Sequence, residues 1–388
     1  ADMNRHPGTT RPGPVLVVLL TVIGILLIGA LQFPGAAVAS PVRVNTLGGE
    51  SALLLDTTNP SLFPSLAATL AHADVELFDN WAGAIVPLGG NSAFGLYLNR
   101  PTPESRRLGA YVQSTGSQLF RSLSPTPAFD AVASTQIRPG LHIGTSLRVA
   151  YDRQQQATDE ASARLRQVLL GVSLGPGSAR GLDATVRIDG ITFTDATQGT
   201  VAGETDGTGI GIDARGRWRL RSGVVALPWL SWERTQAGLS PQSRRVTILR
   251  SGIGINARIK PGVLIVAGVL VGVEEERIDE GSARVSRHRN LQLPTTIGGA
   301  EIRTGPCTVR VGIRHQATWS ERTTNGLEEE IFATQLTSQI GLGVEFGSVL
   351  IDGLLRKKIL LDGPYLLTGG DDEGGLFTNL SLTYRLFQ

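Results

Sequence analysis

The stretch TGIGIDARGRWRLR, residues 208–221, decides the fold of this chain. Its apolar side chains, among them Ile210, Ile212 and Trp218, share one parity, while Asp213 and Arg215 belong to the other. Because a β-strand sends successive side chains to opposite faces, this segment predicts a strand with one apolar face and one charged face. Soluble sandwiches and membrane barrels both use such strands, so the neighbouring sequence has to identify the solvent.

The same period-two pattern continues from about residue 74 to residue 387, interrupted by turns that carry Gly or Pro. Seven of these turns are short enough to join neighbouring antiparallel strands, at residues 87–91, 138–140, 175–177, 221–223, 260–262, 304–306 and 346–348. Longer polar connections are expected between them, at residues 101–126, 152–163, 195–206, 235–243, 276–282, 321–328 and 362–374. Short turns that alternate with longer connections are typical of outer-membrane barrels. The pattern predicts sixteen strands if Asn80 and Trp81 form a bend, with fourteen as the alternative.

Residues 1–39 have the features of a secretory signal peptide. Arg5 and Arg11 precede an apolar run over residues 15–31, and Ala37 and Ala39 form an A-x-A cleavage site. The alternative is a retained membrane anchor, because the run lies at the short edge of the range for a spanning helix. We therefore expect a signal peptide (1–39), a plug or hatch segment (40–73) and a barrel (74–388).

Composition agrees with an all-β chain and excludes several kinds of function. Glycine is abundant, with 48 residues, and charged residues make up only 18% of the chain. The single cysteine, Cys307, excludes an intramolecular disulfide framework and a cysteine-based metal site. A net charge of +2 gives no reason to expect nucleic acid as a partner. The sequence contains no Walker loop, Rossmann fingerprint or histidine metal pair, so we expect no cofactor and no metal.

The two faces of the strands predict a transmembrane antiparallel up-and-down barrel in the bacterial outer membrane. A closed barrel pairs every backbone group in lipid, its apolar face contacts the outer-membrane lipid, and its polar face lines the lumen. Seven arginines are expected to line that lumen: Arg148, Arg187, Arg215, Arg217, Arg219, Arg310 and Arg314. Outer-membrane barrels commonly finish on an aromatic-terminated strand that the barrel-insertion machinery recognises. Here Phe387 is penultimate and out of register with the apolar face of the last strand.

The N-terminal segment resembles that of a known family. Leu47-Gly48-Gly49, Asp56 with Asn59-Pro60, and Phe63-Pro64 precede IVPLGG at residues 85–90 and FGLYL at residues 94–98. This arrangement is similar to the start of outer-membrane barrels distantly related to the FadL-type transporters of hydrophobic compounds. The resemblance implies a plug inside the lumen, a barrel that typically has fourteen strands, and a plug motif made of Gly48, Gly49, Asp56, Asn59, Pro60 and Phe63.

Three functions compete at this level. The first is a channel or transporter for small anionic or amphipathic or hydrophobic compounds, although the arginines could also simply solvate a wide lumen in pairs with Asp and Glu. The alternative is a plugged structural or docking barrel that binds a partner through its loops without transport. The third, an enzyme, is not expected, because His142 and His288 have no nearby G-x-S-x-G nucleophile motif.

Overall fold

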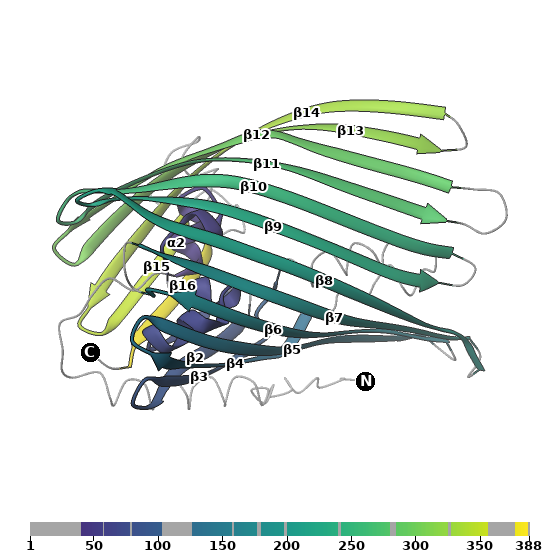
Figure 1. The fold of residues 1–388 in the computed structure, drawn as a ribbon, viewed down its shortest axis with the longest axis horizontal. Helices are drawn as coiled ribbons and strands as arrows, with labels where there is room; N and C mark the ends of the chain where they lie inside the picture. The colour runs from purple at the N-terminus through teal and green to yellow at the C-terminus, as the bar shows by residue number, and fades with distance from the viewer. Residues whose placement is uncertain are drawn as a thin grey trace, which may run out of the picture.

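The computed structural model describes residues 40–386, apart from residues 57, 78–79, 103–125, 157–158, 177–179, 198–199, 240–241, 280–284, 325–326 and 356–376. The described residues form one closed barrel of sixteen antiparallel strands, each paired with its neighbours in chain order, and the first strand pairs with the last (Figure 1). The predicted all-β barrel and the preferred count of sixteen strands are confirmed. The predicted signal peptide, residues 1–39, lies outside the described residues.

The sixteen strands follow one another along the chain. They are β1 (His72–Glu76), β2 (Trp81–Gly89), β3 (Ser92–Leu98), β4 (Thr126–Arg138), β5 (Leu141–Gln156), β6 (Asp159–Leu174), β7 (Gly181–Thr197), β8 (Thr200–Arg221), β9 (Val224–Leu239), β10 (Gln242–Lys260), β11 (Val263–Asp279), β12 (Val285–Thr304), β13 (Cys307–Thr324), β14 (Leu327–Phe346), β15 (Val349–Leu355) and β16 (Phe377–Arg385). Strand β1 begins at His72, before the expected boundary at residue 74. Asn80 has a φ of 53° in the bend between β1 and β2, where the sequence predicts a turn.

Glycines in the left-handed region close the short turns. Gly140, Gly223 and Gly262 have φ values of 77°, 76° and 78°, a conformation in which a residue with a Cβ would be strained. All seven predicted short turns lie between consecutive strands, from β2 and β3 to β14 and β15. The positions of the short turns are therefore predicted correctly. We call the end of the barrel where they lie the short-turn end.

The expectation of long polar connections at the opposite end is wrong at five of the seven places. Strands β5 and β6 stay paired from Arg153 with Ser162 to Gln156 with Asp159, inside the stretch predicted as a connection. The connections expected at residues 195–206, 235–243, 276–282 and 321–328 are likewise mostly strand. These segments lose alternation because both of their faces are polar, but backbone pairing does not require an apolar face. The other two connections fall almost entirely outside the described residues.

The outer face of the barrel is apolar and the inner face is polar. In β8, the outward side chains of Ile210 and Ile212 are 41% and 44% exposed, whereas the inward Arg215 and Arg217 are 1% and 3% exposed. A closed barrel with an apolar belt outside satisfies its backbone in lipid. This protein is therefore an outer-membrane β-barrel, with lipid against its apolar face.

A small segment, which we call the plug (residues 40–71), lies inside the barrel and is drawn in purple in Figure 1. It consists of α2 (Pro41–Thr46) and three 3₁₀ turns, η1 (Ser51–Leu53), η2 (Asn59–Ser61) and η3 (Pro64–Thr69). Helix α2 contacts β13 to β16, η1 contacts β9 and β10, and η3 contacts β3 to β6. Among the described residues, no helix is long and apolar enough to cross a bilayer. The plug thus touches the wall around most of its circumference.

Candidate functional site

Wall glycines form a seat against which the plug packs. A Cβ added to any of the seven seat glycines would lie between 2.0 and 3.1 Å from a plug atom: Gly144, Gly171, Gly254, Gly268, Gly299, Gly312 and Gly341. At Gly312 the nearest atom is the carbonyl oxygen of Thr46, and at Gly144 it is the backbone of Pro64 and Ser65. At Gly144, Gly254, Gly312 and Gly341 the plug atom would lie within 2.6 Å, closer than real Cβ atoms come, so a larger residue there requires the plug or the strand to move. At the other three glycines a Cβ would fit only tightly, and the neighbouring atoms would have to shift slightly.

The plug lies near the short-turn end of the barrel. This follows from the position of the seat glycines, which are only a few residues from the turns. Gly144 follows the turn glycine Gly140 closely, and Gly312 follows Gly305. The lumen beyond the plug therefore extends toward the opposite end, where β7, β8 and β10 to β14 reach far from the plug (Figure 1).

One side of the plug is tied to the wall by a chain of ion pairs. Arg43 of the plug contacts Asp56 of the plug at 2.6 Å and Glu301 of β12 at 2.6 Å. Glu301 also accepts from Arg310 at 2.7 Å, and Arg310 contacts Asp352 at 2.5 Å. Ser40 closes the chain by donating to Asp352 at 2.6 Å. The chain thus begins and ends on the plug, and it connects three strands.

Arg215 ties the other side of the plug to the wall. Its guanidinium contacts Asp183 at 2.9 Å and donates to Asn59 Oδ1 at 2.9 Å and to the Leu54 carbonyl at 3.1 Å. It also lies 4.7 Å from the ring centroid of Phe63, within the range of a cation–π contact. One wall arginine therefore binds two residues of the predicted plug motif.

The remaining plug-motif residues shape the plug itself. Gly48 and Gly49 have φ values of 113° and 76° after α2, which favours glycine at both positions. Asp56 accepts from the Thr58 amide, and burial raises its pKa above the ordinary value while Arg43 opposes the shift. Asn59 and Pro60 start η2, and Phe63 is fully buried.

The seven arginines expected in the lumen occupy different environments. Five are buried on the inner face and held in ion pairs: Arg148 with Asp130, Arg187 with Asp189 and Glu233, Arg215 and Arg217 with Asp183, and Arg310 with Glu301 and Asp352. Arg148 also donates to the Ser61 carbonyl of the plug. Arg314 is half-buried beside the plug, and Arg219 is exposed at the short-turn end of β8. Most of these arginines therefore neutralise wall carboxylates or hold the plug.

Beyond the plug lies a polar cavity of about 440 Å³ on the inner face of β10 to β13, which we call the chamber. Its polar lining consists of Arg250, Glu274, His288, Asn290, Gln292, Gln316, Thr318 and Ser320. Glu50 of the plug lies near Arg250 and Arg314, which lower its pKa, while burial has the larger effect and raises it. The carboxylate of Glu50 therefore links the plug electrostatically to Arg250 of the chamber.

The chamber was not found from the sequence. Its members come from four strands, and a register shift in β12 between Gln292 and Thr296 moves the inward parity from even to odd positions. Asn290 and Gln292 therefore do not share parity with Glu301, although all three face the lumen. The sequence alone predicts only the inward parity of β13, which Arg310, Arg314, Gln316 and Ser320 share.

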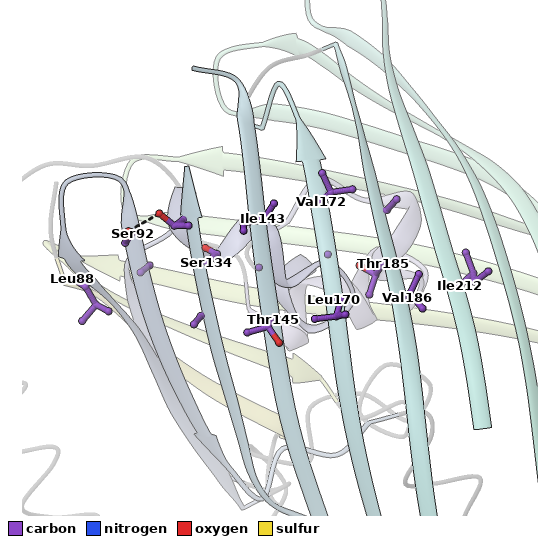
Figure 2. A pocket seen from close by; sticks show the side chains of 16 residues that line it. Leu88, Ser92, Ser134, Ile143, Thr145, Leu170, Val172, Thr185, Val186 and Ile212 are labelled. Carbon is purple, nitrogen blue, oxygen red and sulfur yellow. Dashed lines mark hydrogen bonds between the residues drawn. The ribbon is translucent and has the colours of Figure 1, made fainter. Parts of the chain in front are cut away.

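A second hollow of about 730 Å³ lies across β2 to β8 on the outer side of the barrel (Figure 2). Exposed apolar side chains surround it, including Leu88, Ile143, Leu170 and Val186, with the small residues Ala133 and Ala184 between them. In a membrane this surface contacts lipid acyl chains, so it belongs to the apolar belt and not to the lumen.

Comparison with known proteins gives only distant likenesses. No protein-family model matches this sequence, and a search of curated proteins finds no match. Among solved structures, the FrpB iron transporter from Neisseria meningitidis (F3-3 variant) has a TM-score of 0.42 and 8% identity, covering 73% of this chain and 61% of that chain. The alcaligin outer membrane receptor FauA from Bordetella pertussis has a TM-score of 0.36 and 8% identity, covering 80% and 74%.

The siderophore receptor PirA from Pseudomonas aeruginosa has a TM-score of 0.33 and 9% identity, covering 81% of this chain and 79% of that chain. The chain thus spans less than two thirds of the FrpB transporter. These comparisons give no support to a FadL-type relationship. At such scores they carry no argument about function, which rests on the geometry of the lumen.

Proposed function

We propose that the protein is a gated outer-membrane channel or transporter for small solutes. The observation that carries this proposal is the plug, which rests on seven wall glycines at one end of the lumen and has a polar chamber on its other side. A chamber of about 440 Å³ falls within the usual size range of small-molecule sites. The proposal includes no enzymatic activity.

A small anion is one specific candidate for the solute. The seven predicted arginines give it little support, and the chamber gives it more. Five of the seven predicted arginines already bind carboxylates, so a continuous arginine-lined path is not available to an anion. Arg250 is the arginine that lines the chamber. We therefore propose that a carboxylate-bearing solute would be recognised in the chamber, on β10 to β13.

An amphipathic or hydrophobic solute is the second narrow candidate. Leu165, Ile191 and Phe193 form an apolar cluster with four alanines on the inner face of β5 to β9. A lumen with one polar and one apolar side suits an amphiphile, although these side chains are buried in this conformation. The FadL-type relationship that would favour such cargo stays a prediction, and the barrel has sixteen strands where that superfamily typically has fourteen.

A plugged docking barrel without transport is the competing function. Strands such as β8, with 22 residues, and β14, with 20, are about twice as long as a membrane crossing requires, so they extend beyond the lipid. A wall that extends into water offers a partner an extended surface. This observation favours the alternative without excluding transport.

Reconstitution into planar bilayers and liposomes tests the proposal. We expect the intact protein to show low or intermittent conductance and to admit small solutes in a swelling assay, and a variant without residues 40–71 to conduct steadily. Steady conductance of the plug-less barrel with no solute flux through the intact protein would instead favour the docking function.

A further inference from the structure

We infer that the chamber binds a zwitterion of the amino-acid or short-peptide class, with its carboxylate on Arg250 and its ammonium group on Glu274. The inference rests on the proposed function and names the solute class for it. It starts from two opposite charges that share one cavity but do not neutralise each other.

Arg250 and Glu274 lie on neighbouring strands of the inner face. In the register of β10 and β11, Arg250 pairs with Gly272 and Ile248 pairs with Glu274, so Arg250 and Glu274 are diagonal neighbours. Diagonal cross-strand positions lie roughly 7–8 Å apart at Cα, which leaves room for a small ligand between the two side chains. Gly272, directly opposite Arg250, also lines the cavity and places no side chain in it.

Among the described residues, Arg250 has an electrostatic interaction with Glu50 of the plug, but neither Arg250 nor Glu274 forms a close ion pair. No ion pair within 4 Å joins Arg250 or Glu274 to another described residue, in contrast to the buried arginines around the plug. Both residues are half-buried, so they are partly desolvated but reachable from the lumen. Glu50 of the plug is near Arg250 but forms no hydrogen bond with it among the described contacts.

His288 of the chamber faces a carboxylate that already has a partner. His288 Nδ1 lies 3.8 Å from Glu276, and Glu276 also contacts Arg244. Arg250 and Glu274 therefore present one positive and one negative charge to the chamber, a set that matches a ligand with both charges. A ligand carboxylate would share the Arg250 guanidinium with the Glu50 carboxylate of the plug. A simple anion would be attracted by Arg250 but repelled by Glu274. A simple cation would be attracted by Glu274 but repelled by Arg250.

The neutral lining suits a peptide group. Asn290, Gln292 and Gln316 each carry an amide that can donate and accept, as a peptide bond does. Asn290 accepts from Ser320 at 2.5 Å and Gln292 donates to Thr295 at 2.9 Å, so these side chains are held in place while part of their hydrogen-bonding capacity stays open. A fatty acid would leave these amides unpaired, which is unfavourable.

Titration calorimetry on the purified full chain tests the inference with triglycine as the probe. We expect saturable binding of triglycine, and binding about tenfold weaker or more for N-acetyl-triglycine and for triglycine amide, because each lacks one charge-assisted hydrogen bond. Glu274→Gln should weaken triglycine binding and abolish the effect of N-acetylation. Arg250→Gln should weaken it and abolish the effect of C-terminal amidation.

Two matched variants control for general effects of lost charge. Arg258→Gln removes an exposed arginine from the same strand, and Glu275→Gln removes an exposed glutamate next to Glu274 that pairs with Arg287 on the outer side. Both should bind triglycine as the unmodified protein does. Equal binding of blocked and unblocked peptides, or no saturable binding, would overturn the inference.

Liposome swelling separates this inference from the proposed function. Flux of other small solutes without triglycine binding would overturn the zwitterion site and leave the channel intact. Charge-dependent triglycine binding without any flux would support the site and count against transport.

Discussion

At the scale of single residues, Arg215 shows how a buried charge can serve structure in a lumen. Its guanidinium is 1% exposed and satisfies Asp183 on the wall, Asn59 and the Leu54 carbonyl on the plug, and the face of Phe63. A buried ion pair of this kind is well compensated only while both partners remain. The residue therefore couples the position of the plug to the charge balance of the wall.

Substituting Arg215 should release the plug. Arg215→Met removes one of the two arginines that pair with Asp183, which keeps Arg217 at 3.2 Å and the hydroxyl of Ser173. It also removes the donors to Asn59 and Leu54, so we expect a loss of about 3–5 kcal/mol in plug docking. Single-channel recording should show more frequent and longer openings. Arg219→Met, at the exposed end of the same strand, is the control and should leave conductance unchanged. A closed Arg215→Met channel would contradict the role given to this residue.

At the scale of elements, the inner face of the strands carries two kinds of information. Polar and charged residues face water or the plug, and glycines occur where plug backbone lies directly on the wall. A glycine inside a strand lowers its intrinsic stability, so its presence indicates a close approach. The residues on the inner face of the strands therefore reflect contacts with the plug as well as exposure to the lumen.

Filling the seat should displace the plug from one side. Gly312→Ala places a Cβ about 2.0 Å from the Thr46 carbonyl oxygen, so either α2 moves or β13 bends. We expect raised conductance together with faster proteolysis of the plug. Gly190→Ala in β7 is the matched control, because a Cβ there meets no atom within 4 Å. Equal conductance of the two variants would argue against the seat.

The strand extensions make a separate prediction. Because β5 and β6 remain paired through Gln155 and Glu160, and β13 and β14 through Thr323 and Glu328, their amides should exchange slowly with deuterium. Hydrogen-exchange mass spectrometry should find residues 152–156 and 321–324 protected to an extent comparable with the membrane-spanning parts. Exchange at the rate of an unstructured peptide would instead support the polar connections that the sequence predicts at these two places.

At the scale of the whole molecule, the barrel separates lipid from lumen with a single layer of strands. Exposed Ile212 and inward Asp213 are neighbours in sequence, yet one faces acyl chains and the other faces the interior. The position of the wall in the membrane therefore depends on the outer belt being free of charge.

Placing a charge on that belt should oppose folding into lipid. Ile212→Arg is expected to destabilise the barrel by about 2–4 kcal/mol if the position lies near the bilayer midplane. Urea titration of the protein refolded in lipid vesicles would give the midpoint shift, with Ile212→Val as the control. A shift no larger than that of the valine variant would place Ile212 outside the hydrocarbon.

The sequence by itself determined the strands, their two faces and the seven short turns, because period-two alternation and positive-φ glycines are local properties of the chain. Alternation could not mark the strand ends, because a strand in water on both sides pairs without it. Only the tertiary structure decided that Arg148 and Arg215 bind the plug, and that Arg310 joins two wall carboxylates to which the plug is bound. It also decided that Gly312 and its counterparts form the seat of the plug, and that Arg250 and Glu274 share a chamber. These roles depend on which strand lies beside which plug residue and on a shift of parity in β12, and both arise only when the barrel closes.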